Sequence, residues 1–134
     1  MFCGDTIFHA DIGTAHCDFP GGSASDLYGS LRKLLDFPEH VKIWTGHDYP
    51  PHERGRPVSS MSVGDHRIHN KHIKDGVTED EFVSRRKERD ATLAAPKLLH
   101  PSLQTNIRAG RLPKPNESGQ HILHLPLSVQ GEKW

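Results

Sequence analysis

The sequence predicts a mixed α/β fold, and three observations support this prediction. Two short β-prone runs occupy 2–9 and 41–45. Between them, four leucines recur on one helical face: Leu27, Leu31, Leu34 and Leu35. Further along, Thr-Glu-Asp-Glu at 78–81 has the form of a capping box, which opens another helix. Strands and helices mixed in this way are typical of an α/β protein.

The composition excludes several classes of protein. The chain has 134 residues, which suits one domain of ordinary size. Seventeen basic residues balance seventeen acidic ones, so nothing indicates a nucleic-acid partner or an anionic membrane surface. No apolar run approaches the roughly 18 residues of a membrane span, and we expect no signal peptide, because the first residues contain no basic n-region. Since two cysteines make no disulfide framework, we expect a reducing compartment, the cytoplasm or, for a longer parent protein, mitochondria.

The first half of the chain reads as strand, loop, helix and strand. A strand is expected over 2–9, and a loop over 11–22, which holds three glycines and a proline. The segment 23–38 predicts a helix, because serines can cap its start and a proline ends it. The run 41–45 alternates apolar with polar residues and predicts a second strand.

The second half is expected to be mainly helical. We predict a weak helix over 60–73, a capped helix over 78–90 with Phe82 and Val83 facing inward, and a short helix from Pro101. Gly110 is the expected C-cap of that last helix. Five charged residues are expected on the solvated face of the capped helix: Arg85, Arg86, Lys87, Glu88 and Arg89. The alternating run at 121–127 predicts a final strand.

Asp5 and His47 are the first candidates for chemistry, because each follows or lies in a short apolar run. If the two strands share a sheet, a carboxylate and an imidazole can meet at its edge and bind Zn²⁺ or Fe²⁺. A turn aspartate and a surface histidine are the alternatives. Asp48 is next to His47 in sequence, but adjacency alone does not show that its carboxylate reaches the imidazole ring. Tyr49 offers a phenol that can hydrogen-bond a substrate atom.

Other candidates are weaker. Three histidines repeat every three residues, His66, His69 and His72, and a solvated or interfacial helix face explains them better than a metal site. Arg108 can bind a substrate carboxylate with two parallel hydrogen bonds, or serve as a structural arginine. The sequence has no nucleophile elbow, P-loop or dinucleotide fingerprint, which leaves serine hydrolases and nucleotide-binding proteins unsupported.

Four segments together resemble the metallo-β-lactamase superfamily. They are Gly-Asp-Thr-Ile-Phe at 4–8, Asp-Phe at 18–19, Gly-His-Asp-Tyr at 46–49, and the Asn-x-Arg-x-Gly that ends at Gly110. Each segment is weak alone, whereas their order is specific. The chain is most similar to the branch that holds glyoxalase II (hydroxyacylglutathione hydrolase) and the persulfide dioxygenases.

The resemblance implies the C-terminal half of an αββα sandwich, as one partial domain over 1–134. Asp5 and His47 would be metal ligands, Tyr49 would act at the catalytic site, and His16 and Arg108 would bind substrate. The implied cofactor is two Zn²⁺ ions in a hydrolase of a glutathione-type thioester, or one Fe²⁺ ion in a persulfide dioxygenase. The implied partner is a small thiol-derived molecule.

The sequence departs from the superfamily in three places. His16 stands where close relatives usually have arginine, and Ala109 where persulfide dioxygenases often have cysteine. The His-x-His-x-Asp-His motif, which supplies most of the metal ligands, is absent. We therefore expect that the isolated chain is an inactive fragment or interaction module, and that its uncovered sheet face drives homo-oligomerisation.

Overall fold

A computed structural model describes residues 1–18, 21–93 and 98–126. The chain divides into two compact units, Met1–Leu93 and Ala94–Trp134, and each is described by itself. The sequence-based division into one partial domain stays a prediction. None of the helices in the described part of the chain has the length and apolar character of a membrane span.

The first unit is built on a three-stranded sheet with strand order β1-β2-β3. Strands β1 (Phe2–Gly4) and β2 (Lys42–Thr45) are parallel, with Phe2 opposite Trp44. Strand β3 (Ser60–Ser62) runs antiparallel to β2. Because β1 and β2 are parallel, the residues that follow each strand emerge at the same edge of the sheet.

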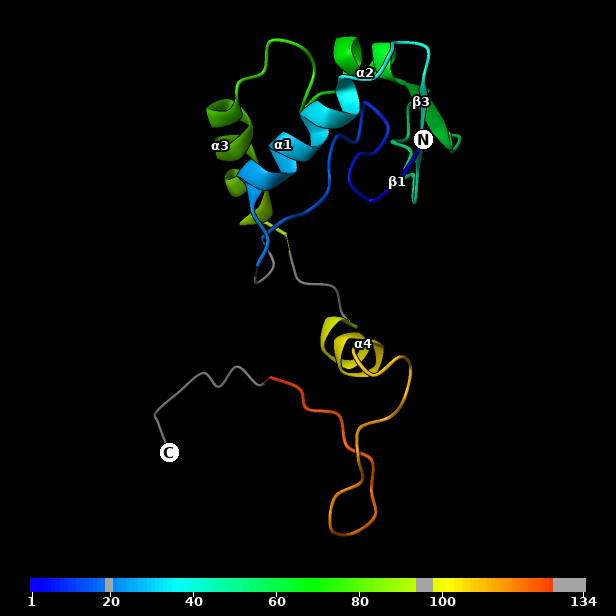
Figure 1. The fold of residues 1–134 in the computed structure, drawn as a ribbon, viewed down its shortest axis with the longest axis vertical. Coiled ribbons are helices and arrows are strands. Elements are labelled where there is room, and N and C mark those ends of the chain that lie inside the picture. The colour runs from blue at the N-terminus through cyan, green and yellow to red at the C-terminus, as the bar shows by residue number, and fades with distance from the viewer. Residues whose placement is uncertain (19–20, 94–97, 127–134) are drawn as a thin grey trace. The chain divides into compact units, whose positions relative to one another are not determined.

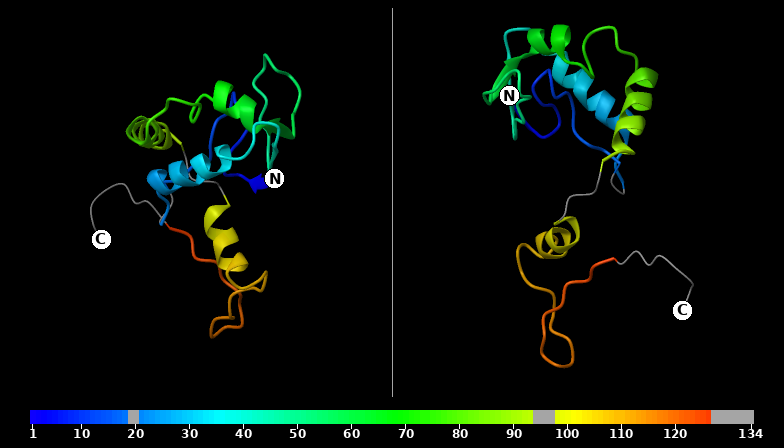
Figure 2. Two further views of the ribbon diagram at one scale, coloured as in Figure 1. Left: turned by 45° about the horizontal axis from the view of Figure 1, so that its top comes forward. Right: turned by 180° about the vertical axis from the view of Figure 1, so that it is seen from behind.

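Helices cover one face of this sheet. They are α1 (Ala24–Leu35), α2 (Val63–His69) and α3 (Glu79–Asp90), and α1 lies between the sheet and α3 (Figures 1 and 2). The predicted caps are confirmed: the Ser23 side chain accepts from the Asp26 N–H at the start of α1, and Thr78 and Glu81 form the capping box of α3.

The core lies between the sheet and these helices. Its buried side chains come from the sheet, all three helices and the connecting loops: Ile7, Leu31, Leu35, Ile43, Val63, Ile73 and Phe82. The opposite face of the sheet exposes an aromatic pair, Phe2 at 87% and Trp44 at 39%, whose ring centroids lie 6.1 Å apart. The sheet is therefore covered on one face and exposes two large aromatic rings on the other.

Two of the predicted elements differ from those observed in this unit. The strand expected over 2–9 ends at Gly4, whose φ of +56° turns the chain, and only an isolated bridge joins Ile7 to Thr14 farther on. The helix expected over 60–73 begins as β3 and becomes α2 at Val63. The Ser62 side chain caps α2, which explains why the switch occurs there.

The second unit contains one helix among its described residues, α4 (Leu99–Asn106). Its C-cap is Ile107, so the prediction of Gly110 was wrong. Residues 121–126 form no strand, and residue 127 lies outside the described part. The reason is that Gln104 takes both backbone groups of His124: its Nε2 donates to the His124 carbonyl at 2.7 Å, and its Oε1 accepts from the His124 N–H at 2.9 Å.

The expected solvated charge face of α3 is wrong at one position. Arg86 is 1% exposed, and it donates to Asp90, one turn along the same helix. Phe82, Arg86 and Asp90, which follow one another at intervals of four, form the buried stripe of α3, while Val83 is half-buried.

The histidine repeat is not a solvated face either. His66 is fully buried and His72 is 5% exposed, whereas His69 is exposed. The Thr14 N–H donates to His72 Nδ1 at 3.1 Å, so this nitrogen carries no proton. Burial, followed by the charge of His9, lowers the pKa of His66 to about 4. Burial, followed by Arg86 and Arg89, lowers that of His72 to about 3.

These two histidines predict acid sensitivity of the fold. Their folded-state pKa values lie below the unfolded value of about 6.5, so below that pH the unfolded chain binds more protons than the folded one. Between pH 6 and pH 4 the free energy of unfolding is expected to fall by up to about 2.7 kcal/mol per pH unit, for two protons. Urea unfolding at several pH values measures this slope, and His66→Gln together with His72→Gln should remove most of it.

Candidate functional site

Asp5 and His47 meet at the carboxyl edge of the sheet. Asp5 directly follows β1 and His47 comes two residues after β2, so the parallel pairing brings them side by side. Asp5 Oδ2 lies 3.5 Å from His47 Nε2, and the two side chains are 55% and 57% exposed. A carboxylate and an imidazole therefore share one open position in the structure, while their role as metal ligands stays a prediction.

Gly46 makes this approach possible. Its N–H donates to the Gly4 carbonyl at 2.9 Å, which ties the end of β2 to the end of β1. A Cβ atom at Gly46 would lie 2.5 Å from Asp5 Oδ1 and 3.3 Å from the Gly4 carbonyl carbon. A side chain at this position would therefore displace Asp5 away from His47, which explains the need for glycine before the histidine.

The Asp5–His47 pair fits a metal ion in chemistry and in spacing, but it is incomplete. Two ligands of a tetrahedral Zn²⁺ ion, each bonded at about 2.0–2.1 Å, lie roughly 3.3 Å apart, close to the distance observed here. Within the described part of the chain, no third His, Cys, Asp or Glu ligand atom lies close enough to join this pair. A bound ion would therefore need further ligands from elsewhere.

Tyr49 lies beside this pair. Its ring is 61% exposed and its centroid lies 5.8 Å from that of His47, in a tilted arrangement. The Phe8 ring lies edge-on to that of Tyr49, and the two ring centroids are 6.3 Å apart. Because the aromatic contacts hold the ring while the side chain stays open to solvent, Tyr49 can reach a molecule bound at Asp5 and His47. Its predicted catalytic role is untested.

Asp48 does not orient the His47 ring. Instead its carboxylate accepts two hydrogen bonds from the Arg54 guanidinium, at 2.6 and 2.7 Å, and a third from the Val58 N–H at 2.6 Å. Arg54 also donates to Asp11 from Nε at 2.7 Å. The bonds from Arg54 lower the pKa of Asp48 to about 2. Arg54 thus joins the loop after β1 to the loop that carries His47.

Nothing in the sequence alone indicated that Arg54 would bridge two carboxylates, because it lies in a loop that is recognisable only as a turn marked by prolines and a glycine.

We expect Arg54→Met to release this loop, because it leaves two carboxylates without their shared cation. Hydrogen exchange at the Val58 amide should then become at least tenfold faster, which corresponds to about 1.4 kcal/mol of lost local stability. Arg56→Met is the matched control, since Arg56 is exposed and two residues away. Equal protection in both variants would contradict the role assigned to Arg54.

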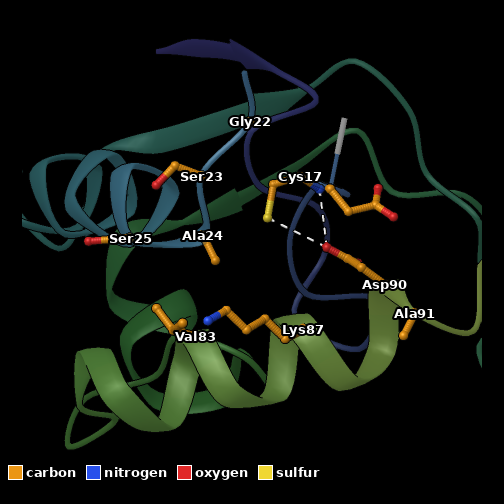
Figure 3. A pocket seen from close by; sticks show the side chains of 10 residues that line it. Cys17, Gly22, Ser23, Ala24, Ser25, Val83, Lys87, Asp90 and Ala91 are labelled. Carbon is orange, nitrogen blue, oxygen red and sulfur yellow. Dashed lines mark hydrogen bonds between the residues drawn. The ribbon is translucent and has the colours of Figure 1, made fainter. Parts of the chain in front are cut away.

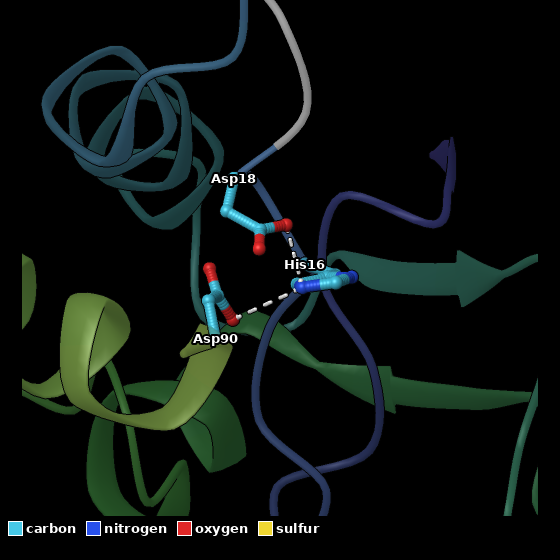
Figure 4. Close-up of side chains that lie close together, drawn as sticks. All are labelled: His16, Asp18 and Asp90. Atoms are coloured by element: carbon cyan, nitrogen blue, oxygen red, sulfur yellow. Dashed lines mark ion pairs between the residues drawn. The ribbon is translucent and has the colours of Figure 1, made fainter. Parts of the chain in front are cut away.

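His16 lies between two carboxylates. Its Nε2 is 2.6 Å from Asp18 Oδ1 and 3.8 Å from Asp90 Oδ1 (Figure 4). Asp18 is 46% exposed, whereas Asp90 is 3% exposed. The surroundings of the imidazole are therefore acidic, and the predicted binding of a substrate by His16 stays a prediction.

A hollow of about 480 Å³ adjoins these residues. Cys17, Asp18 and Asp90 line it together with the start of α1 and Lys87 of α3 (Figure 3). The Cys17 thiol lies 3.5 Å from Asp90 Oδ2 and donates to it. Burial, and then this hydrogen bond, raise the pKa of the thiol. Cys17 is therefore held in its protonated form and is a poor nucleophile at neutral pH.

Arg108 lies in the second unit. It follows the end of α4 by two residues, and its Nη1 donates a hydrogen bond to the carbonyl of Gln104 in that helix. The side chain is exposed. This contact agrees with the structural arginine that the sequence left open, and the predicted carboxylate binding is untested.

The chain is similar to several known proteins, although no protein-family model matches it. It is 53% identical to glyoxylase B2 of Dictyostelium discoideum over 96% of this chain and 44% of that protein. It is 51% identical to a protein of Burkholderia pseudomallei named probable metallo-hydrolase, over 96% of this chain and 43% of the relative. A shorter match, 39% identical over 37% of this chain and 18% of the relative, is to hydroxyacylglutathione hydrolase of Hamiltonella defensa.

A solved structure shares the fold. The crystal structure of ETHE1 from Myxococcus xanthus superimposes with a TM-score of 0.68 and 30% sequence identity, over 82% of this chain and 44% of that one. The chain thus spans less than half the length of the Dictyostelium and Burkholderia relatives. The names metallo-hydrolase and hydroxyacylglutathione hydrolase imply a metal cofactor. The chain belongs to the metallo-β-lactamase superfamily, in the branch of the hydroxyacylglutathione hydrolases and ETHE1, and it corresponds to part of the length of these proteins.

Proposed function

We propose that this chain supplies part of the metal centre of a metallo-β-lactamase-type hydrolase that acts on a glutathione-type thioester. The observation that carries the proposal is the pairing of Asp5 and His47 at 3.5 Å on the carboxyl edge of the sheet. The names of the relatives, which include a metallo-hydrolase and a hydroxyacylglutathione hydrolase, support the reaction class.

Each residue of the site has a proposed task. Asp5 and His47 would hold Zn²⁺ as two of its protein ligands. Two Zn²⁺ ions supply a water of lowered pKa that can attack a thioester carbonyl. Tyr49 would donate a hydrogen bond from its phenol O–H to an oxygen of the bound substrate. Arg54, through Asp48, would keep the loop of His47 and Tyr49 in place.

An iron-dependent persulfide dioxygenase is the second candidate. One observation favours it: the structure is similar to that of ETHE1 over 82% of this chain, with 30% sequence identity. In this reading Asp5 would be one of three ligands of a single Fe²⁺ ion, His47 would not be a main ligand, and Tyr49 would contact the substrate.

A chimaera tests both candidates. The part of the Dictyostelium relative outside the match is joined to this chain, and the product is analysed for metals and assayed. Hydrolysis of a hydroxyacylglutathione with two zinc ions per chain is the expected result. One iron per chain with oxygen uptake on glutathione persulfide would establish the second candidate instead.

Variants of the chimaera locate the chemistry. Asp5→Ala and His47→Ala should each lower kcat by at least about 100-fold, because loss of a metal ligand exceeds the 10–100-fold loss typical of residues that only support ligands. His52→Ala and Glu88→Ala, at exposed positions, are the matched controls. Full activity of a folded Asp5→Ala chimaera would refute the proposal.

The isolated chain is expected to be inactive, because two ligands leave most of the coordination sphere to water.

We also propose that the isolated chain self-associates through the sheet face that exposes Phe2 and Trp44. Sedimentation should show a dimer or larger species, which Phe2→Lys reduces to a monomer. A monomer peak from the unaltered chain at micromolar concentration would count against self-association.

A further inference from the structure

We infer that His16, Asp18 and Asp90 form a second binding site, for a divalent transition-metal cation, separate from Asp5 and His47. The ligand atoms of the three side chains all lie within 4.8 Å of one another. They come from the loop before α1 and from the last residue of α3 (Figure 4). This inference does not depend on the proposed function.

The distances suit one ion at the centre of the group. Ligands of a tetrahedral Zn²⁺ ion lie roughly 3.3 Å apart, and the two distances from His16 Nε2, 2.6 Å and 3.8 Å, fall on either side of this value. Asp18 has to withdraw, and Asp90 has to approach, each by less than about 1 Å. Asp18 is half-exposed and has room to move.

The limited hydrogen-bonding capacity of His16 Nε2 also favours a bound ion at this position. Both carboxylates are directed at the same imidazole nitrogen, which can carry only one proton. Asp90 also accepts hydrogen bonds from Arg86 and Cys17, so His16 Nε2 can donate to Asp18, whereas a cation at this point attracts both carboxylates. A nitrogen and two carboxylate oxygens form a ligand set that Zn²⁺ and Fe²⁺ accept.

Two cations and one thiol lie close to the site. Arg86 donates to Asp90 Oδ1, and the Cys17 thiol and N–H donate to Asp90 Oδ2. Each carboxylate oxygen has two lone pairs, so Oδ1 can serve both Arg86 and an ion. Lys87 lines the adjoining hollow, from which water can complete the coordination. When His16 is neutral, Asp18 and Asp90 carry two negative charges, which the positive charges of Arg86 and Lys87 balance.

The test is a Zn²⁺ titration of the 134-residue chain, followed by calorimetry and by ¹⁵N NMR of the histidine rings. Zinc should shift the His16 Nε2 signal, and the shift should persist in the double variant Asp5→Asn, His47→Gln. His16→Arg places a cation beside both carboxylates but has no lone pair for a metal. It should weaken binding at this site by more than about 100-fold, beyond the loss seen for residues that only support ligands.

Asp18→Asn provides a second variant that leaves the buried Arg86–Asp90 pair intact, and it should weaken zinc binding at least tenfold. Loss of the His16 shift in the Asp5, His47 double variant would overturn the inference, because the zinc would then belong to the first site. Unchanged zinc affinity in a folded His16→Arg chain would overturn it as well.

Discussion

Replacing Arg86 by methionine is expected to lower the free energy of unfolding by about 3–5 kcal/mol, because it leaves the Asp90 carboxylate charged and buried without its partner. Asp90 is 3% exposed, so water cannot replace the guanidinium. The Thr14 carbonyl, which accepts from Arg86 Nη1 at 3.3 Å, also loses its donor. Urea unfolding at pH 7 measures the change.

Two further variants separate the buried pair from a general effect on α3. Arg85→Met is the matched control: Arg85 is exposed, its Nη1 donates to the Lys71 carbonyl, and the expected loss is below about 1 kcal/mol. The double variant Arg86→Met, Asp90→Leu removes both charges and should recover much of the stability. If it is no more stable than Arg86→Met alone, the uncompensated charge is not the cause.

Gly13→Ala is expected to lower the free energy of unfolding nearly as much as Arg86→Met. The φ angle of Gly13 is +101°, where an alanine costs about 1–2 kcal/mol. In addition, the new Cβ would lie 2.2 Å from His72 Nδ1, a buried ring that cannot move without breaking its bond to Thr14. Overpacking of this kind adds about 1–3 kcal/mol, for a total of about 2–5 kcal/mol.

Gly76→Ala is the control for backbone strain. Gly76 has a φ of +88°, but nothing lies within 4 Å of the position of its Cβ. It should therefore lose only the strain of about 1–2 kcal/mol. In a His72→Ala background the clash at Gly13 disappears, so Gly13→Ala should then cost no more than Gly76→Ala. A larger cost in that background would mean that His72 is not what excludes a side chain.

The sequence predicted the Asp5–His47 pairing because it depends on local features. Each residue follows or lies in a β-prone run, and parallel strands place their carboxyl ends together. The remainder of the polar structure could not be predicted in this way. Arg54 reaches Asp11 across 43 positions of sequence, and no local pattern specifies that contact. Asp90 likewise meets Cys17 across 73 positions.

Helix α3 shows why charge patterns mislead. Arginine in a run of charged residues is usually solvated, and Arg85 follows this rule. Arg86 does not, because it follows Phe82 by four residues and therefore lies on the same inward face. The spacing of four from Phe82 to Arg86 to Asp90 was the available signal. It is weak, since charged pairs at this spacing are also common on exposed faces.

The parallel pairing of β1 with β2 has a consequence for the order of folding. The N-terminal amine donates to the Lys42 carbonyl at 2.8 Å, a contact between residues 41 positions apart. Closing a flexible loop of that length costs about 3 kcal/mol of chain entropy. Helix α1 and the capped start of α3 form from neighbouring residues and need no such closure. Strand β1 is therefore expected to pair with β2 only after α1 and the start of α3 have formed.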